Sequence, residues 1–165
     1  MQTTILREVR EDELDAVAAL IRESFLTVAH DFGLTVENCP TNGAFLKTER
    51  LVADRERGNV MFGLFEKDEP FGFMQLRDKG EGVFELEKLC VKPGCRHGGS
   101  GAMLLDKAKS EVISRGGSKM TIGIIEENTQ LKDWYLAHGF VHTGTIDLPH
   151  LPFIVGFMEL ILTNT

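Results

Sequence analysis

The stretch from residue 83 to residue 125 constrains the fold more than any other part of the chain. Val83 to Val91 alternates like a β-strand, residues 102–114 place apolar side chains at helical spacing, and residues 120–125 are apolar and β-branched. A glycine-rich segment, residues 96–102, joins the first strand to the helix. A strand, a helix and a second strand in this order predict one parallel step in a sheet.

The rest of the chain predicts mostly antiparallel neighbours. Lys67 to Pro70 separates two apolar runs with the composition of a hairpin turn, and a second turn is expected at residues 78–82. Further strands are predicted at 5–9, 60–66, 71–76, 140–146 and 153–162, and further helices at 14–29, 44–57 and 128–138. We therefore predict an α+β (mixed α/β) fold, with a central, mostly antiparallel twisted sheet of about seven strands and about four flanking helices. A chain of 165 residues fits a single domain, residues 1–165.

Charge and cysteine content exclude several classes of function. Lys and Arg total 18 against 25 Asp and Glu, a net charge of −7, so the chain as a whole does not attract nucleic acid or an anionic membrane. No window of about 18 apolar residues predicts a membrane span, and the first residues do not have the pattern of a signal peptide. The three cysteines lack the spacing of a metal site or a disulfide framework. We expect no metal and a cytoplasmic location.

The glycine-rich segment has the composition of an anion-binding loop. It lies just before a helix, whose first N–H groups are unpaired and whose dipole favours a negative charge. Glycines at 98, 99 and 101 let a ligand approach the backbone closely, and the Arg96 side chain could add a charged contact. The segment lacks the GxxxxGK[ST] pattern of a P-loop and the third glycine of a dinucleotide fingerprint. The alternative is that these glycines only make a tight turn.

Two spaced motifs carry a resemblance to a known family. Arg96-His-Gly-Gly-Ser-Gly101 fits the pattern Q/R-x-x-G-x-G/A, and residues 89–96 fit the preceding strand exit, apolar-x-Val-x-Pro-x-x-Arg. Downstream, Asn128, Tyr135 and Gly139-Phe140 reproduce the spacing N-x6-Y-x3-G-F. In this order the motifs resemble the GCN5-related N-acetyltransferase (GNAT) family. The order of predicted elements is similar to that family's fold along nearly the whole chain, although residues 1–59 carry no diagnostic motif.

The resemblance implies acetyl-CoA as the acetyl donor, lying in a gap where the strands at 83–91 and 120–125 splay apart. It implies that backbone amides of the glycine-rich segment hold the pyrophosphate and that the backbone of Leu89 and Val91 pairs with the pantetheine arm. The Leu89 amide would also polarise the thioester carbonyl. Asn128 caps its helix, contacts the cofactor, or does both. The implied cofactor-binding residues are Leu89, Val91, Arg96, His97, Gly98, Gly99, Ser100, Gly101, Ala102, Asn128 and Tyr135.

The catalytic candidates are one tyrosine and two acids. Tyr135, the only tyrosine, falls at the position that the resemblance assigns to the general acid, which protonates the departing thiolate; the alternative is a tyrosine that only packs on the sheet. A protonated amine cannot attack, so a base or a chain of waters must remove its proton, and Glu85 and Glu87 are the candidates for the base. Strict alternation places both acids on one face with Leu89 and Val91, opposite Phe84, Leu86, Lys88 and Cys90.

Three functions remain open from the residues. The first is direct acetyl transfer, in a ternary complex, to a primary amine of a small molecule or a peptide. The second is an acyl-CoA-binding regulatory domain without turnover, against which Tyr135 counts. The third is an unrelated binder of phosphate ligands. The resemblance implies an acceptor site built by residues 24–57 and 147–152. The net charge of the chain favours a cationic acceptor. We expect a monomer or a homodimer.

Overall fold

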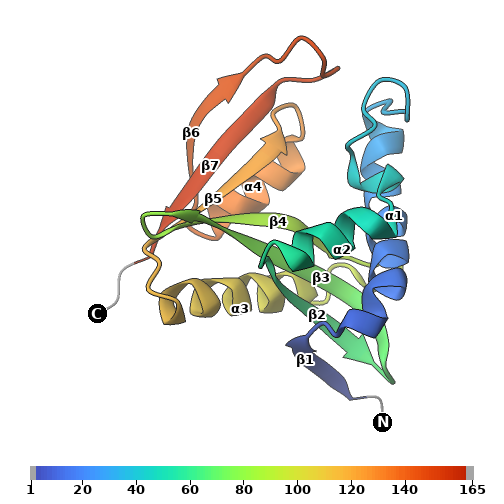
Figure 1. Ribbon diagram of the computed structural model, residues 1–165. Coiled ribbons are helices and arrows are strands. Elements are labelled where there is room, and N and C mark those ends of the chain that lie inside the picture. Colours follow the sequence, from blue (N-terminus) through green and yellow to red (C-terminus); the bar gives the residue numbers. More distant parts are fainter. Residues whose placement is uncertain (1–2, 163–165) are drawn as a thin grey trace.

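A computed structural model describes residues 3–162 of the chain, with a single mixed sheet flanked by helices (Figure 1). The predicted domain extends to both chain ends, of which residues 1–2 and 163–165 lie outside the described residues. The strands are β1 (Thr4–Glu8), β2 (Val60–Glu66), β3 (Glu69–Gly80), β4 (Val83–Val91), β5 (Lys119–Ile125), β6 (Val141–Ile146) and β7 (Val155–Ile161). The helices are α1 (Leu14–Asp31), α2 (Thr48–Glu56), α3 (Ser100–Ser114) and α4 (Thr129–Ala137).

The strands form one seven-stranded sheet in the order β1-β2-β3-β4-β5-β7-β6. All neighbouring pairs are antiparallel except β4 and β5, which are parallel and are connected through α3. The predicted fold class and the single parallel step are confirmed. The parallel step requires a crossover because parallel strands cannot be joined by a short hairpin.

Two element boundaries differ from the sequence-based prediction. Strand β3 runs from Glu69 to Gly80, longer than predicted at both ends. It starts earlier because Lys67 and Asp68, at φ 51° and 63°, make a two-residue turn, and it ends later because it stays paired with β4 up to Gly80 opposite Val83. The helix predicted at 44–57 is split into a 3-10 turn at residues 43–45 and α2. Asn42 accepts a hydrogen bond from the Ala44 amide at 2.9 Å, and Leu46 and Lys47 are extended, so the helix starts only at Thr48.

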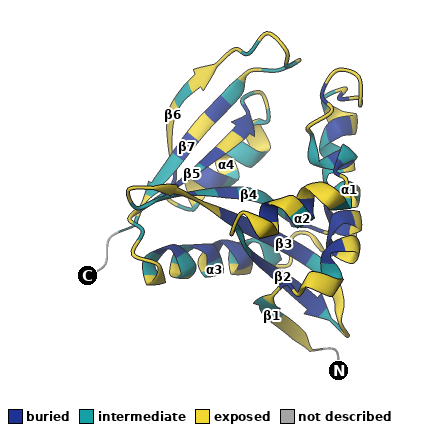
Figure 2. Ribbon diagram, in the orientation of Figure 1, coloured by how far each residue is buried: buried dark blue, intermediate teal, exposed yellow. Residues whose placement is uncertain are grey.

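The sheet separates two apolar cores, which appear as buried segments on both of its faces (Figure 2). On one face, α1 and α2 pack through side chains such as Ile21 and Leu51 onto Phe65 and Phe73. On the other face, α3 and α4 pack onto the central strands, with Leu104 among the fully buried side chains. The site described below lies where the sheet opens between these two layers.

An ion pair fastens β1 to the start of α1. Arg7 donates two hydrogen bonds to the Glu13 carboxylate, from Nη1 to Oε1 at 2.8 Å and from Nη2 to Oε2 at 2.6 Å, and its guanidinium lies 3.7 Å from the Phe65 ring centroid. The hydrogen bonds from Arg7 lower the pKa of Glu13 to about 2, from an ordinary 4.5. A carboxyl group with a lowered pKa stabilises the fold above its unfolded pKa and loses that contribution as the pH falls through its folded pKa.

We expect Glu13→Gln to lower the free energy of unfolding at pH 7 by about 1–2 kcal/mol, because the pair is lost and the group is only partly buried. The difference between the variant and the wild type should shrink below pH 4.5 and become small as the pH falls through about 2, where Glu13 itself becomes protonated in the folded state. Urea unfolding at several pH values measures this difference. Glu8→Gln, on the neighbouring exposed strand position, is the control. A Glu13→Gln difference that stays constant down to pH 2 would contradict the assignment.

Candidate active site

The sheet opens between β4 and β5. In the described chain these strands pair at three positions, from Val83 opposite Lys119 to Glu85 opposite Thr121, while β5 stays paired to β7 along its whole length. After Glu85 the two parallel strands separate. The predicted splay is therefore confirmed, and it leaves the β4 edge at Leu89 and Val91 without a neighbouring strand.

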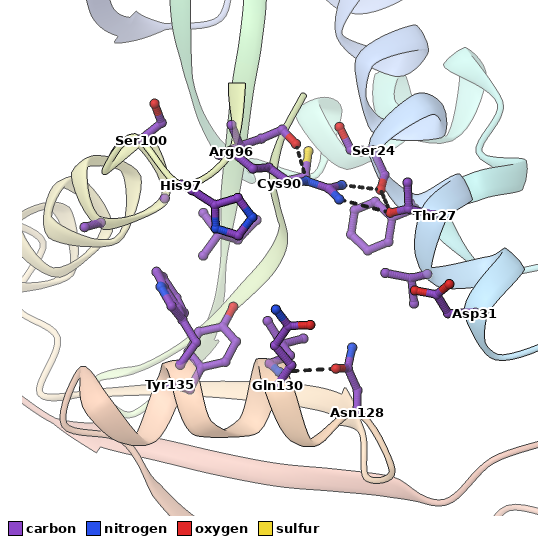
Figure 3. Close-up of a pocket in the computed structure, with 18 of the residues that line it drawn as sticks. Ser24, Thr27, Asp31, Cys90, Arg96, His97, Ser100, Asn128, Gln130 and Tyr135 are labelled. Carbon is purple, nitrogen blue, oxygen red and sulfur yellow. Dashed lines mark hydrogen bonds between the residues drawn. The ribbon is translucent and has the colours of Figure 1, made fainter. Parts of the chain in front are cut away.

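A cavity of about 730 Å³ occupies the opening (Figure 3). It is lined by the start of α3, by one side of α4 and by the second half of α1. The sequence-predicted residues that line it are Leu89, Val91, Arg96, His97, Gly99, Ser100, Gly101, Ala102, Asn128 and Tyr135. Gly98, Glu85 and Glu87 do not line it.

The start of α3 presents free amide groups to this cavity. Gly99 has φ +85°, and the first bond of the helix runs from the Met103 amide to the Gly99 carbonyl at 3.1 Å. The amides of Ser100, Gly101 and Ala102 therefore have no partner within the helix, as at any helix start. A Cβ on Gly101 would lie 3.3 Å from the Trp134 ring, so the lack of a side chain lets α4 approach the loop closely. These amides and the helix dipole make the loop able to bind an anion.

The Arg96 side chain was expected to contact a bound anion, but in the structure it makes hydrogen bonds within the protein. Its guanidinium group donates to three acceptors in the protein: Nε to the Val91 carbonyl at 3.1 Å, Nη1 to Thr27 Oγ1 at 3.1 Å and Nη2 to the Ser24 carbonyl at 2.7 Å (Figure 3). The side chain thus fastens the loop to the end of β4 and to α1. The contribution of this segment to anion binding is then carried by its backbone amides.

Tyr135 lies on α4, with its hydroxyl directed at the cavity (Figure 3). Its ring packs edge-on against Trp134 and Phe140, with centroid distances of 5.0 and 5.1 Å. The residue is buried, and burial raises the pKa of its phenol above the ordinary value of 10. The phenol is therefore a neutral proton donor at all physiological pH values. Asn128 caps the same helix by accepting from the Leu131 amide at 3.2 Å and also lines the cavity.

The wall contributed by α1 was not predicted as part of the cofactor pocket. Ser24, Phe25, Thr27, Val28, Asp31 and Phe32 line the cavity. In the sequence they belong to an ordinary amphipathic helix; in the structure Arg96 of the loop donates to Thr27 Oγ1 and to the Ser24 carbonyl of this helix. Cys90 is buried beside them, and burial raises the pKa of its thiol to about 12, so it is not a nucleophile at neutral pH.

The predicted arrangement of the two acids relative to Leu89 is wrong. Gln75 of β3 faces Glu87, but Phe73 faces Cys90, so β4 holds one extra residue between them and forms a β-bulge, with Lys88 at φ +56°. The extra residue reverses the alternation: Leu89 and Val91 pack on the α3 side with Phe84 and Leu86, while Cys90 packs on the α1 side. Glu87 lies on the α1–α2 side, where its Oε1 accepts from Gln75 Nε2 at 3.2 Å.

Glu85 and Glu87 have different surroundings on that side. Glu85 pairs with Lys79 at 3.3 Å and lies where β4 and β5 are still joined. Glu87 lies beyond the last β4–β5 pair, and burial raises the pKa of its carboxyl group. Of the two acids, Glu87 is the nearer along the strand to the opening.

The comparison with protein families matches this arrangement. Residues 16–140 match the model of the acetyltransferase (GNAT) family. The chain belongs to that family. The matched range contains the α1 wall, the glycine-rich loop and α4 up to Phe140, so it covers all the residues that line the cavity.

Individual relatives agree with the family assignment. The chain is 29% identical over 147 residues to the peptidyl-lysine N-acetyltransferase YjaB of Salmonella typhimurium, covering 88% of this chain and 89% of that protein. The fold is similar to the ribosomal-protein-S18-alanine N-acetyltransferase of Escherichia coli, with TM-score 0.77 and 14% identity over 99% of this chain and 96% of that one. It is also similar to the PaiA N-acetyltransferase of Thermoplasma acidophilum, solved in complex with coenzyme A, with TM-score 0.76 and 18% identity over 96% and 99% of the two chains.

Residues 3–162 hold no group of three or more His, Cys, Asp or Glu side chains arranged to bind a metal ion. Among the helices of the same residues, none is long and apolar enough to cross a membrane.

Proposed function

We propose that this GNAT protein transfers an acetyl group from acetyl-CoA directly to a primary amine of a small molecule or a peptide, with both substrates bound at once. One observation carries the proposal: the unpaired β4 edge, the free amides of α3 and the Tyr135 hydroxyl all line one cavity. A strand edge, an anion site and a proton donor are the three elements that an acyl thioester of a long phosphorylated carrier requires.

Acetyl-CoA fits the groups that line the cavity. The amides of residues 100–102 and the open space at Gly99 suit its pyrophosphate. The free edge of β4 at Leu89 and Val91 offers backbone groups to the amides of the pantetheine arm, as a neighbouring strand would. When bound, acetyl-CoA supplies an activated acetyl thioester. All other steps belong to residues of this chain.

We assign three roles in the transfer. The Leu89 amide donates to the thioester carbonyl oxygen, where negative charge develops as the amine attacks. Tyr135 gives its proton to the sulfur as the carbon–sulfur bond breaks, so that CoA leaves as a thiol. A carboxylate on the α1–α2 side of β4 takes the proton that the amine must lose, and the surroundings of the two acids favour Glu87 over Glu85 for this role.

We expect Glu87→Gln to lower kcat by about tenfold or more, because it removes a general base. Burial raises the pKa of Glu87, so its carboxylate form, and with it kcat, should increase with pH through a value above the ordinary 4.5. The variant should lose this rise, which a pH profile of thiol release measures. Glu85→Gln is the matched comparison on the same strand, and a larger loss there would assign the base to Glu85.

We propose that the acceptor carries a positive charge. Asp31 at the end of α1 and Glu127 before α4 both line the cavity, and the protein has a net charge of −7. A peptide lysine, a peptide N-terminus and a small polyamine all meet this description. The relative that is named a peptidyl-lysine acetyltransferase supports a peptide amine among them.

The first test is a calorimetric titration with acetyl-CoA, with ATP and NAD as controls, because it needs no knowledge of the acceptor. We expect selective binding of acetyl-CoA, followed by thiol release when amines from a panel of lysine peptides, N-terminal peptides and polyamines are added. A folded protein that does not bind acetyl-CoA would overturn the proposal. Binding without thiol release for any amine would favour a regulatory domain that senses acyl-CoA.

A further inference from the structure

Lys88 has an unusual backbone conformation for its place in the fold. Among residues 3–162, five non-glycine residues have positive φ, and four of them, Lys67, Asp68, Glu81 and His97, lie in turns or loops. Lys88 lies inside a strand, at φ +56°. In a bulge of this kind the left-handed position is usually a glycine, because a side chain makes the conformation unfavourable. Such a residue persists only where its surroundings hold it, and it often lies at a functional site.

The bulge determines how β4 passes the cavity. Before it, Glu85 and the residues N-terminal to it are paired with β5; after it, Leu89 and Val91 line the open side. Met74 of β3 faces two residues of β4, so every residue after Lys88 is turned relative to simple alternation. The direction of the Leu89 backbone amide therefore depends on the conformation of Lys88. With Lys88 in the extended region, the amide would turn away from its present direction.

A buried carboxylate holds the Lys88 side chain. Asp54 of α2 is 1% exposed, and its Oδ2 accepts from Lys88 Nζ at 3.4 Å and from Gln75 Nε2 at 3.1 Å. Gln75 also donates to Glu87 at 3.2 Å, Arg57 donates to Asp54 Oδ1, and Arg50 Nε lies 3.8 Å from the same oxygen. This network of hydrogen bonds thus connects Lys88 directly, and Glu87 through Gln75, to Asp54 on α2. Lys88 is one of several partners of this buried carboxylate, and its bond to Asp54 Oδ2 opposes movement of the Lys88 side chain away from α2.

We propose that Asp54 and Lys88 are a positioning pair that holds the β4 bulge in its left-handed conformation and so directs the Leu89 amide at the substrate carbonyl. The inference rests on the proposed function. Neither residue lines the cavity, so neither touches acetyl-CoA, and both act through the backbone of β4. The contact fastens α2 to the strand that carries the carbonyl donor, across 34 residues of sequence.

Two substitutions of Lys88 separate conformation from charge. Lys88→Met and Lys88→Gly both remove the ammonium group and its bond to Asp54. Only glycine adopts a positive φ without cost, so only Lys88→Gly can keep the bulge when the contact between residue 88 and Asp54 is lost. Asp54→Asn removes the other end of the pair, and the double variant Asp54→Asn/Lys88→Gly tests whether glycine restores what the loss of Asp54 removes. Thermal unfolding of each variant shows that it is folded.

The readout is the carbonyl stretching frequency of bound acetyl-CoA, labelled with carbon-13 at the acetyl carbonyl. This measurement needs no acceptor amine, and a hydrogen bond from the Leu89 amide to the carbonyl oxygen lowers the stretching frequency. We expect a lowered frequency in the wild type and in Lys88→Gly, and a frequency near that of free acetyl-CoA in Lys88→Met. The affinity for acetyl-CoA should stay within about threefold, because the α3 amides supply the pyrophosphate contacts. With any acceptor found in the panel, kcat of Lys88→Met should fall by about tenfold or more.

Three results would overturn the inference. In the first, Lys88→Met keeps the wild-type carbonyl frequency, so the Leu89 amide does not need the contact between Lys88 and Asp54. In the second, Lys88→Gly loses it as fully as Lys88→Met, so the ammonium group itself matters. In the third, the wild type binds acetyl-CoA but its carbonyl frequency is that of the free molecule, so Leu89 is not the donor. A wild type that binds no acetyl-CoA overturns the proposed function itself, which the calorimetric titration detects separately.

Discussion

Gly99→Glu is expected to abolish acetyl-CoA binding, with a loss of affinity of about 100-fold or more. Gly99 precedes the first turn of α3, at the point where the free amides of Ser100 and the following residues meet the cavity. A carboxylate there occupies the positive end of the helix and repels the pyrophosphate. In addition, φ +85° at Gly99 is unfavourable for any side chain, so the loop loses its present shape. A calorimetric titration measures the loss.

Gly116→Glu is the matched control for this substitution. Gly116 follows the other end of α3, has φ +80°, is exposed, and has no atom within 4 Å of a built Cβ, as is also the case for Gly99. The two variants therefore share the added charge, the backbone strain and the open surroundings. They differ in which end of the helix they occupy. We expect Gly116→Glu to bind acetyl-CoA like the wild type. If Gly99→Glu bound acetyl-CoA with the same affinity as Gly116→Glu, the glycine-rich segment would be only a turn and not the pyrophosphate site.

Tyr135→Phe is expected to lower kcat by about tenfold or more while the affinity for acetyl-CoA changes by less than about twofold. The phenol ring packs between Trp134 and Phe140, and phenylalanine keeps these contacts, so the fold and the pocket shape stay the same. Only the proton that the departing thiolate needs is lost. Thiol release under saturating acetyl-CoA measures kcat, and calorimetry measures the affinity.

The pH dependence gives a second test of Tyr135. Burial raises the pKa of its phenol above 10, so the group stays protonated and kcat should show no decline from its ionisation up to about pH 10. The variant should therefore be slower than the wild type by the same factor across this range. An equal loss of kcat and of affinity, or a lower thermal midpoint of unfolding, would mean that Tyr135 is structural.

Much of the fold and part of the site could be predicted from the sequence because their signals are local. The glycines at 99 and 101 and the Asn128 cap determine turns and helix starts within a few residues, and the structure has those helices close to where they were expected. The antiparallel neighbours β2, β3 and β4 and the single parallel step follow from connection lengths. Residues 24–57 were expected at the acceptor site, but the contact of α1 with the glycine-rich loop was not predicted, because a serine and a threonine on a helix do not indicate that Arg96 will contact them.

The α+β class, the glycine-rich loop before α3 and the place of Tyr135 on α4 could be predicted without the structure, since each depends on short-range spacing. The faces of the sheet on which the β4 side chains lie depend instead on long-range packing. Alternation places Glu87 and Leu89 on the same side, and a lysine gives no local indication of a bulge. We propose above that the bulge depends on Asp54, a buried carboxylate on α2 that accepts a hydrogen bond from Lys88. A contact between residues so far apart in the chain forms only when the sheet and α2 pack together, so no local pattern could have contained it.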